Sequence, residues 1–479
     1  MRSKGALLHA DDEEFVSDGA NDPLAELVLS HHGRLSHLRL SSIRRSHDVV
    51  KRILSLPFES LEQFTLAVNK ASRPLSLRDM SLFGGHSPRL RVLDLMHPLL
   101  PFSSVDWTSP AFNTLETLRL SLDATNAHFI NLTFLQAIRR MSHLRTLCIL
   151  ELTMHSVVSA CDACSHAQHN IVPLDGLETL VLLGSPHNHA HFLRHIRLQP
   201  HSRLVMNGAI PHPAVLLPPE RMYGELSEAL KDVWCHNEVV PPFQAACMYF
   251  EETARRGDYL VQLCLSRDIT PRTPSPTALP FHGVSDGPAS NTLCMYMRDD
   301  GAPSIIPAFP IHHVRSLILQ GGSFHLSYAN LFMFIGIERL HVCPTAARRA
   351  YTDILRLLEL REDVPLLLPR LRHLSAPDFR LSSALDTFAP GGLSGRSGRA
   401  ELWQKHGITF YLYVEEEIAF VRDGKIEETS CKGIPEARVL QAIDRLKGVD
   451  YVRIVNKDFD LFAAWRHIDQ IDIDANKKP

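Results

Sequence analysis

Apolar residues recur along this chain in a six-residue phrase, L-x-x-L-x-L. The phrase reads LSHLRL at 35–40, LEQFTL at 61–66, LRVLDL at 90–95, LETLRL at 115–120, LRTLCI at 144–149 and LETLVL at 177–182. A second set has VRSLIL at 314–319, IERLHV at 337–342 and LRHLSA at 371–376. Alternation of the last two apolar residues predicts a short strand with both side chains on one face. The copies recur at about the 20–29-residue period of leucine-rich repeats.

The stretches between the phrases have a helical pattern instead. VVKRILSL at 49–56 and LTFLQAIRRM at 132–141 place apolar residues three and four positions apart. One strand–helix unit cannot bury its apolar face alone, whereas stacked units can. The sequence therefore predicts an α/β fold, an irregular leucine-rich-repeat solenoid with parallel strands on the concave face and helices on the convex face. The alternative is an ordinary α/β domain with leucine-rich strands.

The same pattern divides the chain into five parts. We expect an acidic flexible tail at 1–22, a first block of leucine-rich repeats at 23–205, an irregular insertion at 206–310, a second block with a C-terminal cap at 311–465 and a tail at 466–479. Residues 267–290 are rich in Pro, Ser, Thr and Gly, which predicts a disordered loop. Further helices are expected at 221–234, 346–360 and 436–449, and further strands at 408–414 and 451–456.

Composition narrows the classes of function. The 479 residues are 45% hydrophobic and carry a net charge of −3, so no broad basic field attracts nucleic acid or an anionic membrane. No apolar run approaches the length of a signal-peptide core or a membrane span. Nine cysteines with irregular spacing do not make a disulfide framework. A reducing compartment, cytoplasmic or nuclear, is the expectation.

Several short catalytic motifs are absent from the sequence. There is no H-E-x-x-H, no G-x-x-x-x-G-K-[ST] and no Rossmann glycine fingerprint. Repeat folds present extended surfaces to their partners. We therefore predict a non-catalytic protein that needs no cofactor.

Two His/Cys clusters are candidate metal ligands. The first holds Cys161, Cys164, His166 and His169, and the second holds His187, His189, His191 and His195. Two cysteines separated by two residues are a zinc half-site. Structural zinc sites usually place a dozen or so residues between their ligand pairs, whereas here the second pair follows at once. A polar loop and a solvated helix face carrying His191 and His195 are the interpretation, with a zinc-binding module as the alternative.

A segment of the expected loop also contains candidate phosphorylation sites. In RTPSP at 272–276, Thr273 and Ser275 each precede a proline, which fits proline-directed kinases. Added phosphate charge could act on such a loop. Chance occurrence of these common dipeptides is the alternative.

The residues between the paired leucines of each phrase should point to the concave face. They are Arg39, Thr65, Asp94, Arg119, Cys148 and Val181, followed by Ile318, His341 and Ser375. These residues carry charges of both signs and include no row of aromatic side chains. Such a face suits binding to a protein surface better than binding to a phosphate backbone. This face is the predicted site for a protein partner, unless its residues are merely solvated.

Several phrases carry a family resemblance. LRTLCILEL, LETLVLLGSP and HFLRHIRLQP, with the closing ELWQKHGITFYLYVEEE, resemble the F-box/leucine-rich-repeat-like proteins of mushroom-forming fungi over residues 24–460. The resemblance implies a receptor subunit of an SCF-type (cullin–RING) ubiquitin ligase. In such receptors an N-terminal F-box binds a Skp-type adaptor and the repeats bind the ubiquitination substrate.

The chain departs from this family at the F-box. LPFESLEQF at 56–64 resembles an F-box opening, but it is in register with the second leucine phrase, and the residues after it do not supply the remaining helices. Either the F-box was lost or the start codon lies upstream of Met1. The leading hypothesis is therefore a protein-interaction scaffold. The alternatives are a ligase receptor with a missing or cryptic F-box and a zinc-binding module.

Overall fold

The fold was analysed in a computed structural model. It describes residues 7–11, 23–41, 47–67, 77, 80–101, 104–123, 132–152, 171–199, 201–208, 218–235, 242–252, 259–267, 292–298, 301–321, 333–342, 368–375, 407, 409–414, 441 and 452–456. The chain forms two compact units. Unit 1 contains Met1–Val240 and Met295–Ala308, and unit 2 contains Pro241–Cys294 and Phe309–Pro479.

Unit 1 is built on an open sheet of parallel strands. In spatial order these are β1 (Leu8–Asp11), β2 (Leu35–Ser41), β3 (Gln63–Ala67), β4 (Val92–Pro101), β5 (Thr117–Asp123), β6 (Thr146–Leu152), β8 (Thr179–Gly184) and β10 (Arg203–Asn207). Each pairs in parallel with the next. Two short strands, β7 (Val172–Leu174) and β9 (Ile196–Leu198), form a separate parallel pair.

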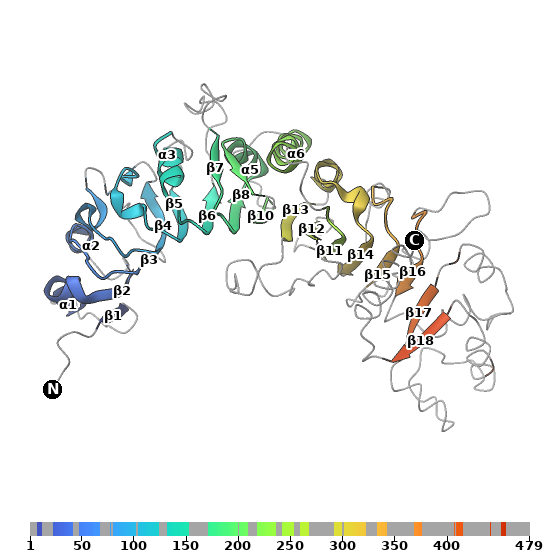
Figure 1. Ribbon diagram of the computed structural model, residues 1–479, viewed down its shortest axis with the longest axis horizontal. Coiled ribbons are helices and arrows are strands. Elements are labelled where there is room, and N and C mark those ends of the chain that lie inside the picture. The colour runs from blue at the N-terminus through green and yellow to red at the C-terminus, as the bar shows by residue number, and fades with distance from the viewer. Residues whose placement is uncertain are drawn as a thin grey trace, which may run out of the picture. The chain divides into compact units, whose positions relative to one another are not determined.

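Helices connect these strands. The α-helices of unit 1 are α1 (Pro23–His31), α2 (His47–Leu54), α3 (Leu132–Arg140), α5 (Pro186–Leu193), α6 (Pro219–Cys235) and α7 (Ala302–Ile305). Shorter 3₁₀ turns are η2 (His32–Arg34), η4 (Leu82–Gly85), η6 (Pro110–Phe112) and η8 (Ile306–Ala308). Figure 1 shows α2, α3, α5 and α6 along one side of the strands of this unit.

The core of unit 1 lies between these helices and the sheet. The fourth residues of the leucine phrases form one row of paired Cα positions: Leu38, Phe64, Leu93, Leu118, Leu147 and Leu180. The sixth residues form a second row: Leu40, Leu66, Leu95, Leu120, Ile149 and Leu182. All of these side chains are buried, as are the first leucines of the phrases. The phrase therefore recurs because each copy supplies three side chains to one continuous apolar layer.

Unit 2 also contains a row of mostly parallel strands, in which β11 and β12 form an antiparallel pair. Its strands are β11 (Ala245–Glu252), β12 (Tyr259–Ser266), β14 (Ser316–Gly321), β15 (Arg339–Val342), β16 (His373–Ser375), β17 (Thr409–Val414) and β18 (Val452–Asn456), with the 3₁₀ turn η9 (Ile311–His313) before β14. β11 pairs antiparallel with β12 and parallel with β14. The strands from β14 to β18 pair in parallel in chain order. A further strand, β13 (Thr292–Arg298), has residues in both units.

The predicted α/β class with a mostly parallel sheet is confirmed. The expected helix at 221–234 lies within α6, and the expected strands at 408–414 and 451–456 are β17 and β18. The helices expected at 346–360 and 436–449 and the loop at 267–290 lie outside the described residues, apart from residue 441. Within the described residues, no helix combines the length and the apolarity needed to cross a membrane.

Two segments are more ordered than the sequence predicts. The expected acidic tail at 1–22 contains β1, which pairs with β2. The expected irregular insertion at 206–310 contains β11, β12 and β13. β1 has only four residues, and β11 has Ala246 and Met248 where the paired strand β14 has Leu317 and Leu319. β12, by contrast, contains the leucine phrase as LVQLCL at 260–265. Leucine spacing therefore could not find β1, β11 or β13, whereas the signal for β12 was present in the sequence.

The string LPFESLEQF, which resembles an F-box opening, belongs to a repeat. Residues 57–62 connect α2 to β3 without a helix, and Gln63 and Phe64 begin β3. Phe58 and Phe64 are fully buried and pack edge-to-face against Phe83, with ring centroids 5.8 and 5.1 Å away. The string is thus used in the core of unit 1.

Candidate functional site

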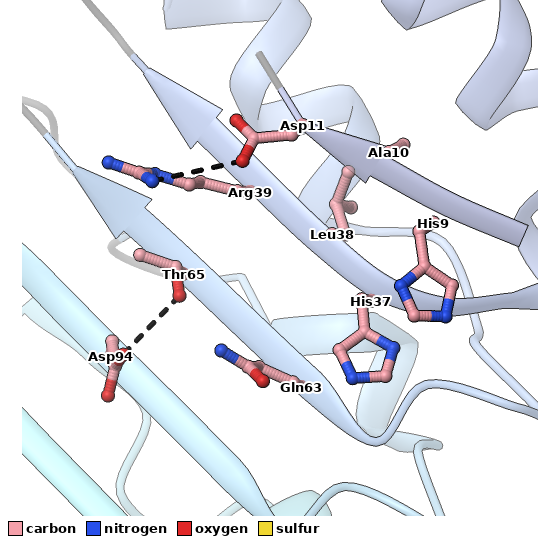
Figure 2. A pocket seen from close by; sticks show the side chains of 9 residues that line it. All are labelled: His9, Ala10, Asp11, His37, Leu38, Arg39, Gln63, Thr65 and Asp94. Atoms are coloured by element: carbon pink, nitrogen blue, oxygen red, sulfur yellow. Dashed lines mark hydrogen bonds and ion pairs between the residues drawn. The ribbon is translucent and has the colours of Figure 1, made fainter. Parts of the chain in front are cut away.

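A cavity of about 450 Å³ opens on the sheet of unit 1 over β1–β4. Successive side chains of a strand point to opposite faces, so residues between the buried leucines belong to the face away from the core. Seven of the nine lining residues come from this alternate set: His9, Asp11, His37, Arg39, Gln63, Thr65 and Asp94. Ala10 and Leu38 complete the lining. Figure 2 shows them side by side on neighbouring strands. The site is therefore a polar hollow on a sheet.

Strand register arranges these residues in two rows. Asp11, Arg39, Thr65 and Asp94 are successive paired positions across β1, β2, β3 and β4, and Arg119 continues the row on β5. His9, His37 and Gln63 form the neighbouring row. Parallel strands lie about 4.8 Å apart, so each side chain can contact its neighbour in the row.

The predicted face residues fall into register within each unit. In unit 1 the row Arg39, Thr65, Asp94, Arg119, Cys148 and Val181 is continuous. In unit 2, Ile318, His341 and Ser375 are consecutive paired positions on β14, β15 and β16. Alternation within the leucine phrase was sufficient to predict these two rows.

The expectation that the whole row forms an accessible surface is wrong. Cys148 and Val181 are buried in unit 1, and Ile318, His341 and Ser375 are buried in unit 2. In unit 1 the residue types change along the row from charged and hydroxyl side chains to the thiol of Cys148 and the aliphatic Val181, which cost little to bury. The accessible polar part is therefore limited to β1–β5.

Asp94 is the most enclosed charge of the site. Thr65 Oγ1 donates a hydrogen bond to its Oδ2, and Arg119 Nη1 lies at the same distance, 3.4 Å, from that oxygen. Its other oxygen, Oδ1, is buried without a hydrogen-bond partner. Burial raises the pKa of Asp94 above its usual range, although Arg119 and Thr65 oppose the shift. The site therefore contains a carboxylate that burial destabilises.

The outer charges of the row are more loosely held. Arg39 Nη1 lies 3.8 Å from Asp11 Oδ2, and both side chains keep more than a third of their surface exposed (Figure 2). An exposed pair at this distance contributes little to stability. Both groups can consequently reorient toward a bound molecule at small cost.

Two histidines stack at the end of the hollow. The rings of His9 and His37 lie 4.0 Å apart at an angle of 17° (Figure 2), and Ser36 Oγ is 3.0 Å from His37 Nδ1. Burial lowers the pKa of His37, and the neighbouring His9 lowers it further, while Glu62 opposes both. The shift favours the neutral form of the His37 ring, and both rings offer nitrogens that can take part in hydrogen bonds.

Cys161, Cys164, His166 and His169 lie outside the described residues, as do Thr273 and Ser275. Among the residues that the structure describes, no group of three or more His, Cys, Asp or Glu side chains could hold a metal ion.

The second histidine cluster is partly a core element. α5 ends at Leu193, and His195 follows it in a buried position instead of lying on a solvated helix face. His189 is completely buried, and His187 Nδ1 lies 2.6 Å from Glu225 Oε2 of α6. The expectation of a solvated face is wrong for His195, because the helix is shorter than its apolar pattern indicated.

Sequence reasoning missed half of the hollow. His9 and Asp11 lie in the segment expected to be a tail, and His37 and Gln63 occupy the third position of their phrases, outside the predicted row of fifth positions. The signal was present, because residues two positions apart on a strand share a face. Extending the row from the fifth to the third position would have found His37 and Gln63.

Comparison of the chain with protein-family models, with curated proteins and with solved structures found no match in any of the three.

Proposed function

We propose that this chain is a non-catalytic, irregular leucine-rich-repeat scaffold that binds a protein partner on the polar sheet face of β1–β5. The observation that carries the proposal is the pair of polar rows across parallel strands, which open into a hollow of about 450 Å³. The strand backbones pair with their neighbours, so side chains provide the recognition. Stacked leucine phrases with helices on one side support the solenoid interpretation.

The chemistry of the face favours a protein over other partners. Asp11 and Asp94 accept hydrogen bonds, Arg39 and Arg119 donate them, and Gln63 does both. Charges of both signs alternate within a few ångströms, so the face has no single field that would attract a phosphate backbone. A protein surface with its own mixed charges and amides can complement such a pattern.

A photo-crosslinking amino acid placed at Gln63 tests the proposal, with the same residue at Arg52, exposed on α2, as the matched control. The partner captured from the native cell is identified, purified and titrated into the full-length protein by calorimetry. Arg39→Glu should weaken binding at least about tenfold, because a charge contact in the interface is reversed. Arg52→Glu should leave the affinity unchanged. Equal capture from both positions, or equal affinities of the two variants, would refute the assignment of this face.

The same protein tests the ubiquitin-ligase alternative. Calorimetric titration with a Skp-type adaptor at micromolar concentrations would show binding for a receptor with a cryptic F-box. Deletion of residues 1–70 in a variant that still folds should then abolish it. For the zinc-binding alternative, metal analysis compares the purified chain with a Cys161→Ser/Cys164→Ser variant, and stoichiometric zinc lost in the variant would favour it.

A further inference from the structure

Three cysteines of unit 2 lie next to one another on neighbouring strands. Cys247 of β11 is directly opposite Cys264 of β12 in the antiparallel pair. Cys264 Sγ lies 3.1 Å from Cys294 Sγ of β13. All three side chains are buried and reduced. Two sulfurs at this separation are in hydrogen-bond contact, which leaves them one bond-forming step from a disulfide.

Hydrogen bonding distinguishes the two contacting sulfurs. The Cys264 thiol donates to Cys294 Sγ, and the buried Gln262 amide donates to the same sulfur over 3.0 Å. The amide is farther from Cys264 Sγ, at 3.6 Å. A sulfur that accepts from two donors is the one on which negative charge is best stabilised. Cys294 is thereby prepared to be the nucleophile.

Cys264 is prepared for the complementary role. Its hydrogen bond to Cys294, followed by burial, raises the pKa of Cys264 well above the usual range. It therefore keeps its proton while it faces the Cys294 sulfur. A protonated thiol is a poor nucleophile, so Cys264 does not make the first attack on the peroxide. Its contact with Cys294 places it to resolve an oxidised Cys294.

We propose that Cys264 and Cys294 are an oxidative modification site that forms a reversible disulfide with a peroxide as co-reactant. Cys294 Sγ attacks one peroxide oxygen, the O–O bond breaks, and a sulfenic acid forms on Cys294 with release of one water. Cys264 Sγ then attacks the Cys294 sulfur, the S–OH bond breaks, and the hydroxyl leaves as a second water with the Cys264 proton. Two thiols and one hydrogen peroxide thus give one disulfide and two waters. A dithiol reverses the bond by exchange.

The bond needs little movement and has a local consequence. The sulfurs must approach from 3.1 Å to about 2.05 Å, which is within the reach of small side-chain rotations. The resulting crosslink joins the ends of the segment between β12 and β13. That segment contains Thr273 and Ser275, the candidate phosphorylation sites. Oxidation would therefore close this segment into a covalent loop.

The test treats the full-length protein with stoichiometric hydrogen peroxide and counts thiols after denaturation. The count should fall by two from nine, and digestion without reduction should yield a peptide that links Cys264 to Cys294. Dithiothreitol should restore the count. Cys148→Ser, which removes another buried thiol, serves as the control and should still form the crosslink.

Dimedone, which labels sulfenic acids, tests the assigned order of steps. Cys264→Ser should accumulate label on Cys294, whereas Cys294→Ser should leave Cys264 unlabelled at the same dose. Circular dichroism checks that both variants fold, and the wild-type crosslink decides the site even if one does not. A Cys247–Cys264 crosslink, or no Cys264–Cys294 crosslink while other thiols oxidise, would overturn the proposal. Label on Cys264 in the second variant would overturn the roles.

Discussion

The Arg119 guanidinium lies 3.4 Å from the Asp94 carboxylate, and the two residues are directly paired on the neighbouring strands β5 and β4. The Arg119 side chain is 42% exposed and that of Asp94 only 10% exposed. The Arg119 guanidinium is therefore partly in water, whereas the Asp94 carboxylate is enclosed. Burial consequently has a larger effect on the pKa of Asp94 than the ion pair has. A charge kept in an unfavourable position on a polar face is more typical of recognition than of stability.

Asp94→Asn should stabilise the fold at pH 7. The folded-state pKa is raised above the unfolded value of about 3.9, so the unfolded chain releases this proton more readily. The free energy of unfolding therefore falls as the pH rises from the unfolded-state pKa through the folded-state pKa of Asp94. Below about 3.9 Asp94 is protonated in both states, and the cost of burying its charge disappears. Urea unfolding from pH 3 to 8 should show wild type and variant converging at low pH.

Arg119→Met provides the opposite change at the same contact. Removing the guanidinium deprives Asp94 Oδ2 of one partner, so the free energy of unfolding at pH 7 should fall by about 1–3 kcal/mol. Arg91→Met removes an exposed pair with Glu116 and should cost less than about 1 kcal/mol. Equal losses in the two variants would contradict the role assigned to burial.

Charged residues alternate in sign where the chain enters six strands of unit 1, namely β3, β4, β5, β6, β8 and β10. Backbone bonds connect Glu62, Arg91, Glu116, Arg145, Glu178 and Arg203 in that order. Arg145 Nη1 lies 3.2 Å from Glu178 Oε1. Arg145→Glu would place three carboxylates in succession, which should cost roughly 1 kcal/mol at low salt. In 1 M salt the Debye length is about 3 Å, so most of this loss of stability should disappear when unfolding by urea is measured there. Arg145→Gln should lose about half as much.

The sequence predicted the repeated layer because its signal is local and redundant. Leu38, Leu93 and Leu118 each sit in the same phrase, so an error in one copy does not change the register of the others. The face row followed from the same alternation. Its burial did not, because whether Val181 or Ser375 is covered depends on segments distant in sequence.

The parts that sequence reasoning missed have weak local signals. β1 is identified by its pairing with β2, which no pattern within four residues can encode. Cys264 and Cys294 lie in strands that are far apart in the sequence, and only pairing in three dimensions brings their sulfurs together. The stacked rings of His9 and His37 likewise depend on the register between β1 and β2.

His189 should make unit 1 sensitive to acid. Burial lowers its pKa to about 3, while the unfolded chain has a value near 6.5. Between these values the unfolded state binds a proton that the folded state does not, so stability falls as the pH falls below about 6.5. The slope reaches at most about 1.4 kcal/mol per pH unit. His189→Leu should flatten the dependence, whereas His143→Gln on an exposed position should not. Parallel pH profiles for all three proteins would contradict this assignment.

Two glycines near Tyr223 should respond in opposite ways to the addition of one methyl group. A Cβ at Gly301 would lie 2.5 Å from the ring of Tyr223 in α6. The Tyr223 side chain is buried, and its hydroxyl donates a hydrogen bond to the Gly208 carbonyl. Gly301→Ala should therefore lower the free energy of unfolding by about 1–3 kcal/mol through overpacking.

Gly224 is the matched control for that change, since it follows Tyr223 in α6 and a Cβ there meets no atom within 4 Å. Gly224→Ala should raise stability by about 0.5–1 kcal/mol, because alanine is the better helix former. Chemical denaturation of both variants measures the difference. A neutral Gly301→Ala beside a stabilising Gly224→Ala would mean that the Tyr223 ring moves aside at no cost. That outcome would contradict the close packing of α6 against Gly301. In that case Tyr223→Leu would also change the free energy of unfolding little.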